Sequence, residues 1–231
     1  MEQNLKEFLD QFFRLPIAGK KVRIPYWRNR FLLKGVNRIQ GPFGGKGTPR
    51  QIRRATLRKA RQTETNLVRL SSRQIRLFMQ RKKIGLDCSG FVFQVLEFLK
   101  PRFWENLTLS PGRSNNPVRR LNTTALTAPG NSHKVKDQTK MIQIGDLIPL
   151  SFKNKKIDHV MVIINKTPTK ITYAHSSSKT RPTGPHLGRI KITNPEKPLW
   201  QQEWKEKLAD GQFLLKLAQP VLKKIGVRRI L

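Results

Sequence analysis

The sequence predicts an α+β protein, with helices in its first hundred residues and antiparallel strands in its later part. Apolar residues recur at helical spacing up to residue 99, whereas residues 146–192 hold short β-rich runs separated by turn residues. At 231 residues the chain can bury a substantial core. We expect a basic helical extension (1–83), a core (84–195) with a polar insertion (101–140), and a C-terminal amphipathic helical segment (196–231).

The N-terminal extension holds three predicted helices that pack on the core. The first has an apolar face over residues 5–13 and ends before a proline. Thr48 and Pro49 are typical of an N-cap followed by proline at the first helical position, so a helix is expected from there to about residue 62. Ser71 or Ser72 opens the third helix.

The only cysteine of the chain, Cys88, lies at the predicted start of a buried helix. Asp87 is a good N-cap, apolar residues follow at helical spacing to Leu99, and Pro101 ends the pattern. A helix N-terminus stabilises a thiolate through its unpaired N–H groups and its dipole. Cys88 is therefore a candidate nucleophile, and a small buried hydrophobe is the alternative. One cysteine excludes an internal disulfide and a cysteine-cluster zinc site, and it fits a reducing compartment.

Residues 101–140 are rich in Asn, Ser, Thr, Pro and Arg and only weakly periodic, so a long insertion or flexible loop is expected there. Four strand-like runs follow the insertion, at residues 146–150, 159–164, 171–175 and 189–192.

The second and third runs are joined by residues 165–170, which suit a hairpin connection. A hairpin centred near Thr167 places His159 and His175 opposite one another or within one register step. Their positions have the same parity, so both side chains point to one face of the sheet. This pair supplies the base that a nucleophilic thiol needs.

In the C-terminal segment, Phe213, Leu214 and Leu217 form an apolar stripe on a predicted helix that Pro220 interrupts. We expect this segment to dock on the core, with attachment to an anionic membrane as the alternative.

Four separated motifs resemble, in their order along the chain, the signature of NlpC-type cell-wall peptidases, a family of papain-like cysteine peptidases. They are residues 87–92 (DCSGFV), 145–148 (GDLI), 158–163 (DHVMVI) and 173–177 (YAHSS). The resemblance covers roughly residues 84–192. It implies a papain-like fold, in which an antiparallel sheet packs against the helix that carries the catalytic cysteine.

The resemblance also implies roles for three residues. Cys88 would be the nucleophile, His159 the general base, and His175 the residue that orients and polarises His159. The implied reaction is hydrolysis of an amide bond in the peptides of cell-wall peptidoglycan.

The chain departs from the family near the oxyanion hole. Members commonly have a tyrosine shortly before the cysteine, but no tyrosine lies between Trp27 and Cys88, so Tyr26 is the upstream candidate. The backbone N–H of Cys88 can supply one oxyanion donor in any case. Other candidates for substrate or oxyanion contacts are Asp87, Ser89, Ser176 and His186. We expect His186 on a loop near the site, whereas His133, in the insertion, has no expected role.

No metal or cofactor is expected. The histidine spacings match no metal-binding pair, and no carboxylate completes a ligand set. Residues 41–48 (GPFGGKGT) lack the spacing of a Walker motif, so we expect a mobile loop there and no nucleotide site.

No segment approaches the roughly 18 apolar residues of a membrane span. Residues 1–10 have acids where a signal peptide has a basic region, and no apolar run follows. These features predict a cytoplasmic protein, with non-classical export left open.

The chain is strongly basic, with a net charge of +33. Residues 11–86 hold 21 Lys or Arg and one acid, Glu64. Such a field attracts polyanions, which include wall polymers, nucleic acid and anionic membrane surfaces. A basic bias of the whole source proteome is the alternative explanation.

Three functions therefore stay open. The first is a peptidoglycan amide hydrolase. The second is an intracellular thiol amidase, thioesterase or acyltransferase. The third is a polyanion-binding protein with a vestigial site.

Overall fold

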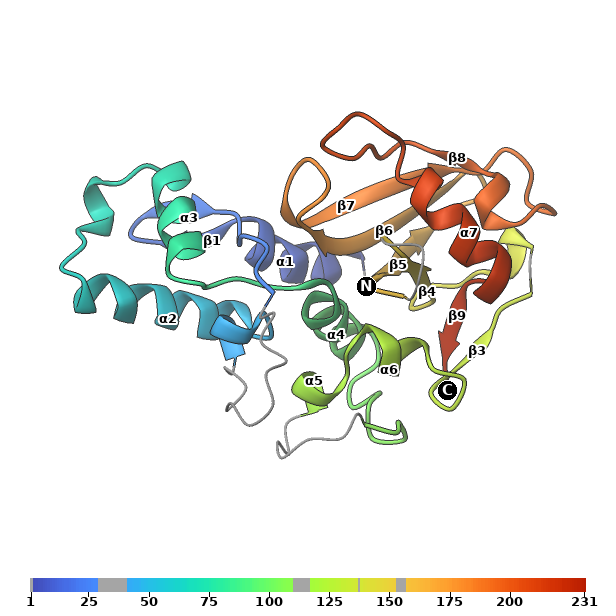
Figure 1. The fold of residues 1–231 in the computed structure, drawn as a ribbon, viewed down its shortest axis with the longest axis horizontal. Helices are drawn as coiled ribbons and strands as arrows, with labels where there is room; N and C mark the ends of the chain where they lie inside the picture. Colours follow the sequence, from blue (N-terminus) through green and yellow to red (C-terminus); the bar gives the residue numbers. More distant parts are fainter. Residues whose placement is uncertain (1, 29–40, 110–116, 137, 153–156) are drawn as a thin grey trace.

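The computed structural model describes residues 2–28, 41–109, 117–136, 138–152 and 157–231. It confirms the α+β class, because helices pack on antiparallel sheets (Figure 1). None of the helices within these ranges is long and apolar enough to cross a membrane.

The N-terminal part contains the three helices that the sequence predicts. The elements are α1 (Glu2–Phe13), β1 (Leu15–Ile17), β2 (Lys20–Val22), η1 (Gly41–Gly44), α2 (Pro49–Gln62), η2 (Leu67–Arg69) and α3 (Ser72–Arg81). Thr48 and Ser71 each form a capping box with the glutamine three residues later, which explains where α2 and α3 begin. In Figure 1, α2 and α3 form a smaller lobe at one end, away from the large sheet.

Helix α4 (Cys88–Leu99) starts and ends where the sequence places it. The side chain of Asp87 caps it by accepting a hydrogen bond of 2.6 Å from the N–H of Gly90. Aromatic rings join it to α1, since the centroid of Phe98 lies 4.4 Å from that of Phe8. Asp87 therefore holds the cysteine end of α4, and α1 holds the other end.

The region after α4 is not the single polar loop that the sequence predicts. It contains α5 (Pro117–Arg120), α6 (Thr123–Thr127), β3 (Ser132–Lys134) and η3 (Thr139–Met141). Leu121 and Leu126 are fully buried in the core that α4 shares. Elements this short have too few residues to give a periodic pattern, and burial of scattered leucines stabilises them instead. Residues 110–116 of this region lie outside the described part.

Seven strands form one sheet in the order β3-β9-β4-β5-β6-β7-β8. The remaining strands are β4 (Leu147–Leu150), β5 (His159–Lys166), β6 (Lys170–Ser177), β7 (Gly184–Lys191), β8 (Glu203–Trp204) and β9 (Arg228–Ile230). Strands β5 and β6 form the predicted hairpin, with Val162 opposite Ala174. The hairpin is centred at residue 168, one residue beyond Thr167. Residues with numbers of the same parity therefore lie opposite each other in this part of the hairpin, and His159 and His175 share one face of the sheet as predicted.

The two faces of the sheet are covered differently. One face packs on α1 and α4, and the other packs on α7 (Leu215–Ile225), as Figure 1 shows. The prediction that Pro220 interrupts the last helix is wrong, because α7 continues through it. A proline removes one helical hydrogen bond, and the burial of Ala218 and Leu222 against the sheet compensates.

The C-terminal segment is also more than a helix. Strands β8 and β9 both belong to the large sheet, although they are far apart in it. Of the predicted apolar stripe, Leu214 is buried, whereas Phe213 is 50% exposed. Docking on the core is confirmed, and it includes strand pairing that no helical pattern indicates.

Candidate active site

Cys88 lies at the N-terminus of α4, beside the start of β5. Its Sγ is 3.7 Å from the hydroxyl of Thr123 on α6 and 3.9 Å from the carbonyl oxygen of Asp158. The residue is only 4% exposed. Burial, with the charge of Asp87, raises the pKa of the thiol, and these effects outweigh Lys46 and the hydrogen bonds that stabilise the thiolate. The helix terminus therefore does not produce the low pKa that the sequence analysis expected, and the resting thiol is protonated.

The chain just before Cys88 is fixed from three sides. The N–H of Asp87 donates to the carbonyl oxygen of Gly45 at 2.9 Å, and Leu86 forms β-bridges with Tyr26 and Lys46. The hydroxyl of Ser176 donates to the carbonyl oxygen of Leu86 at 2.8 Å. Ser176, a predicted substrate contact, thus ties β6 to the cysteine loop.

These contacts correct the expectation of a mobile loop at residues 41–48. Lys46 and Gly45 in this segment support the start of α4. Gly90 makes the approach possible, because a Cβ there would collide with the carbonyl oxygen of Gly45. A glycine-rich segment reads as loop in the sequence, but here glycine allows two backbones to lie against each other.

Lys46 forms an almost buried ion pair behind the cysteine. Its Nζ lies 3.0 Å from Oδ1 of Asp87, and it also donates to the hydroxyl of Ser89. Asp87 and Ser89, both predicted substrate contacts, are engaged with Lys46 and with each other. Sequence reasoning missed Lys46, since a lysine 42 positions before the cysteine belongs to none of the four motifs.

His159 and His175 meet as the parity argument predicts. Nε2 of His159 lies 2.9 Å from Nδ1 of His175, and both residues are buried. On the other side of the ring, Nε2 of His175 lies 3.0 and 3.1 Å from the two carboxylate oxygens of Glu206.

The hydrogen-bond pattern assigns the protons of both rings. A carboxylate only accepts, so His175 carries its proton on Nε2 and accepts from the Nε2–H of His159 through Nδ1. His159 then has its lone pair on Nδ1. Among the described residues, that nitrogen has no hydrogen-bond partner. It is the atom available to act as a base.

Both histidines are neutral at pH 7. Burial lowers the pKa of His159 well below its ordinary value, the neighbouring His175 adds to this effect, and Glu206 opposes it. Burial likewise lowers the pKa of His175. A neutral imidazole is the form that can accept the proton of a thiol.

The prediction that His186 lies on a loop is wrong. It lies inside β7, directly opposite His175 on β6, and not on a loop. Its Nε2 is 2.8 Å from the Glu206 carboxylate, and its Nδ1 is 2.8 Å from the carbonyl oxygen of Gly184. The flanking residues 184–188 (GPHLG) read as a turn, but continuous pairing with β6 overrides this local composition.

Sequence reasoning missed Glu206 altogether. Its carboxylate also accepts a hydrogen bond of 2.6 Å from the hydroxyl of Tyr173. Although burial raises the pKa of Glu206, the interactions with His175 and His186 lower it far more, so the group is ionised. No signal in the sequence marks this glutamate, because it follows a two-residue strand and lies 31 positions from His175.

Glu206 places a carboxylate beside two histidines, although the sequence spacings indicate no such ligand set. One ligand atom each from His175, His186 and Glu206 lies within 4.8 Å of the others. The nitrogens of both histidines, however, lie within 3.1 Å of the carboxylate, which is the separation of a direct hydrogen bond. Hydrogen bonds alone can therefore hold the two imidazole rings against the carboxylate.

Two other predicted features take clear places. The backbone of Tyr26 pairs with Leu86, two residues before Cys88, so this aromatic residue lies near the start of α4. His133 is exposed on β3, as befits a residue with no expected role.

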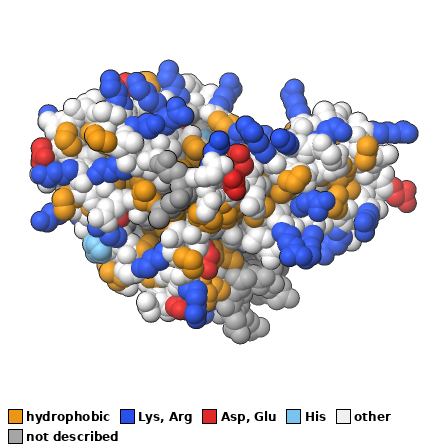
Figure 2. All heavy atoms as spheres, turned by 180° about the vertical axis from the view of Figure 1, so that it is seen from behind, with side chains coloured by type: hydrophobic (Ala, Val, Ile, Leu, Met, Phe, Trp, Pro, Cys, Tyr) orange, Lys and Arg blue, Asp and Glu red, His pale blue; other side chains and the backbone are white. Residues whose placement is uncertain are grey.

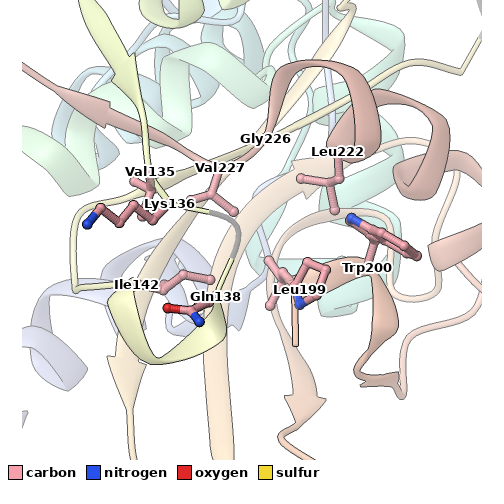
Figure 3. A pocket seen from close by; sticks show the side chains of 10 residues that line it. Val135, Lys136, Gln138, Ile142, Leu199, Trp200, Leu222, Gly226 and Val227 are labelled. Atoms are coloured by element: carbon pink, nitrogen blue, oxygen red, sulfur yellow. The ribbon is translucent and has the colours of Figure 1, made fainter. Parts of the chain in front are cut away.

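A small pocket lies elsewhere in the molecule. Figure 3 shows it between α7, η4 (Leu199–Gln201) and residues 138–142, lined by Ile142, Trp200 and Leu222 among others. It contains none of the residues around Cys88. The thiol and its histidines are instead enclosed by packed side chains.

Comparison of the chain with protein-family models, with curated proteins and with solved structures finds no match. The order of the motifs and the geometry around Cys88 therefore carry the functional argument.

Proposed function

We propose that this protein is a cysteine hydrolase of papain-like, NlpC-type architecture that cleaves an amide bond with Cys88, His159 and His175. The observation that supports it most is the hydrogen bond of 2.9 Å between the two histidines, at the start of the strand against which Sγ lies. A structural histidine pair would not need an unpaired ring nitrogen on the strand that begins beside the only thiol of the chain.

In the proposed reaction, Nδ1 of His159 takes the proton of the Cys88 thiol as sulfur attacks the amide carbonyl. The C–N bond then breaks, and the amine leaves with the proton from His159. Water, deprotonated by the same nitrogen, hydrolyses the thioester and regenerates the thiol. Because burial raises the pKa of Cys88, proton transfer accompanies attack and no stable thiolate precedes it.

Backbone N–H groups at the start of α4 hold the oxyanion. They are those of Cys88 and Ser89, because the N–H groups of Gly90 and Phe91 already donate to Asp87. Tyr26 is the side-chain candidate for a second donor, because its backbone is bridged to Leu86.

The substrate that the motifs favour is a peptide of peptidoglycan. The charge of the chain supports an anionic polymer as partner, and Figure 2 shows Lys and Arg side chains over much of one face, with few acids between them. In the second function, an intracellular thiol amidase, thioesterase or acyltransferase, the same three residues act on another acyl group. In the third function, a polyanion-binding protein, none of the three residues has a catalytic role.

Digestion of purified peptidoglycan tests the proposal. We expect the protein to release new amino groups, and the Cys88→Ala and His159→Ala variants to release about 100-fold fewer, which is within the usual contribution of a nucleophile or general base. His133→Ala is the matched control, since this histidine is exposed and far along the sheet at β3. Release that persists in Cys88→Ala would contradict the proposal.

Labelling of Cys88 with iodoacetamide distinguishes the two enzymatic functions from the third function, a polyanion-binding protein with a vestigial site. Cys88 should react faster in the native protein than in His159→Ala, because His159 is the proposed base that takes the thiol proton. Equal rates would rule out both enzymatic functions. A His159-dependent rate without peptidoglycan cleavage would instead favour the second function, an enzyme with another acyl substrate.

A further inference from the structure

We propose that Glu206 is a positioning residue that holds His175, and through it His159, in the tautomer and orientation needed for general-base catalysis at Cys88. The inference rests on the proposed function and extends the predicted triad by a carboxylate from the C-terminal segment.

The first support is the hydrogen bonding of the carboxylate. Glu206 is 9% exposed and accepts from groups on two strands: Tyr173 and His175 on β6, and His186 on β7. A carboxylate with donors on several sides has one orientation, so the ring of His175 is fixed as well. The Tyr173 hydroxyl donates here, because the carboxylate only accepts and because burial and the carboxylate keep the pKa of the tyrosine well above its ordinary value.

The second support is the backbone on both sides of Glu206. The N–H of Lys205 donates to the carbonyl oxygen of Arg189 on β7 at 3.1 Å. The carbonyl oxygen of Glu206 itself accepts from the N–H of Leu214 at 2.9 Å. These bonds place the carboxylate at β7 whether or not its side chain has a partner.

The third support is a glycine that makes room for the carboxylate. A Cβ at Gly188, on β7, would overlap the ring of Tyr173 and Oε2 of Glu206. Gly188 does not have a positive φ angle, so its backbone conformation does not demand glycine. Glycine is required there because the Tyr173 ring and the Glu206 carboxylate approach the backbone closely. The sheet is thus shaped around the contact between Tyr173 and Glu206.

Charge gives this contact a chemical consequence. The groups that act on His159 are His175, His186 and Arg28, which disfavour its protonated form, and Glu206, which favours it. Glu206 is the only one of these groups that stabilises the imidazolium formed when His159 takes the thiol proton. Loss of the Glu206 charge should therefore make His159 a weaker base, and it should also leave the histidine ring less well oriented.

The test compares Glu206→Gln with the native protein by the pH dependence of iodoacetamide labelling at Cys88. We expect the His159-dependent rate to fall by about tenfold or more. The acid limb of the profile should move to lower pH, because the pKa of His159 falls when the carboxylate is removed. A merely structural role would lower the rate without moving this limb.

Glu203→Gln is the matched control, since it removes an exposed carboxylate three positions away that pairs with Lys205 and Lys191. It should leave rate and profile unchanged. An unchanged acid limb in Glu206→Gln would overturn the proposal. So would a metal ion that the native protein retains and Glu206→Gln loses, because the cluster would then hold a cation.

The tautomers can be read in the native protein, which avoids a variant that fails to fold. Nitrogen NMR of the ring should find the proton of His175 on Nε2 and the lone pair of His159 on Nδ1. A proton on Nδ1 of His175 would overturn the inference. Failure of the proposed function looks different, since labelling would then be independent of His159 in the native protein itself.

Discussion

At Cys88, burial and charge act against each other. The enclosure of the sulfur favours the neutral thiol, while the ammonium of Lys46 favours the thiolate. Lys46 is itself held by Asp87, the N-cap of the same helix. In this ion pair Lys46 lowers the pKa of the thiol and Asp87 raises it, so Lys46 acts both on the stability of the helix start and on the reactivity of the thiol.

Replacing Lys46 with Met should disturb both properties. The carboxylate of Asp87 would lose its buried partner, which we expect to destabilise the fold by about 3 kcal/mol. The pKa of Cys88 should rise further, so labelling at pH 7 should slow. Urea unfolding and the labelling rate measure the two effects, and Lys216→Met, an exposed change on α7, is the control. Faster labelling in Lys46→Met would contradict the electrostatic argument.

The buried histidines predict instability in acid. The pKa values of His159 and His175 are lowered in the folded state, so below about pH 6.5 the unfolded chain binds protons that the native protein does not. Each histidine should cost up to about 1.4 kcal/mol of stability at pH 5.5 relative to pH 7.5. The stabilisation from Glu206, whose pKa is also lowered in the folded state, begins to be lost only below about pH 4.5 and continues to fall toward that lower pKa.

Urea unfolding at the two pH values measures this loss. The His159→Gln variant should lose less stability between pH 7.5 and 5.5 than the native protein does. His133→Gln should behave like the native protein, because His133 is exposed. An equal pH dependence in all three proteins would mean that His159 is not buried in its neutral form.

At the scale of the elements, the β6–β7 pair positions most of the site. It is the most extensively paired hairpin of the sheet, with eight residue pairs from Lys170 to Ser177. His175 and His186 face each other in it, and Gly188 leaves space for Tyr173 and Glu206. The local sequence of β7 is poor in strand formers at its start, so the strand depends on its partner.

We therefore expect Gly188→Ala to be costly. The added methyl group has no free volume, and overpacking of this kind costs about 3 kcal/mol. The His159-dependent part of Cys88 labelling should fall with it, since the Glu206 carboxylate must move. Gly130→Ala, where a Cβ would meet nothing within 4 Å, should be close to neutral. Thermal unfolding compares the two variants, and equal melting temperatures would contradict the packing argument.

At the scale of the whole molecule, the basic charge is concentrated in the smaller lobe. Exposed arginines occur along both of its helices, and on α2 they include Arg54, Arg58 and Arg61. The one acid of residues 11–86, Glu64, lies just beyond the end of α2. A phosphate polymer would meet many more cations than carboxylates there.

Neutralising Arg54, Arg58 and Arg61 to Gln should weaken binding to duplex DNA, used here as a polyanion probe. If each contacts a phosphate, the slope of log affinity against log salt should fall by about 0.9 per residue. The matched control replaces Lys197, Lys216 and Lys224, three exposed lysines of the C-terminal segment, with Gln. Equal losses in both triple variants would mean that net charge, and not the lobe, determines binding.

The sequence by itself determined the helix that carries Cys88, the β5–β6 hairpin and the common face of His159 and His175. Capping, proline positions and strand parity are local, so nearby residues suffice to predict them. Only the tertiary structure decided the ion pair of Lys46, the place of Thr123 beside the sulfur and the carboxylate of Glu206. These groups come from segments whose local pattern is weak, and they reach the site because sheet pairing and burial bring distant parts of the chain together.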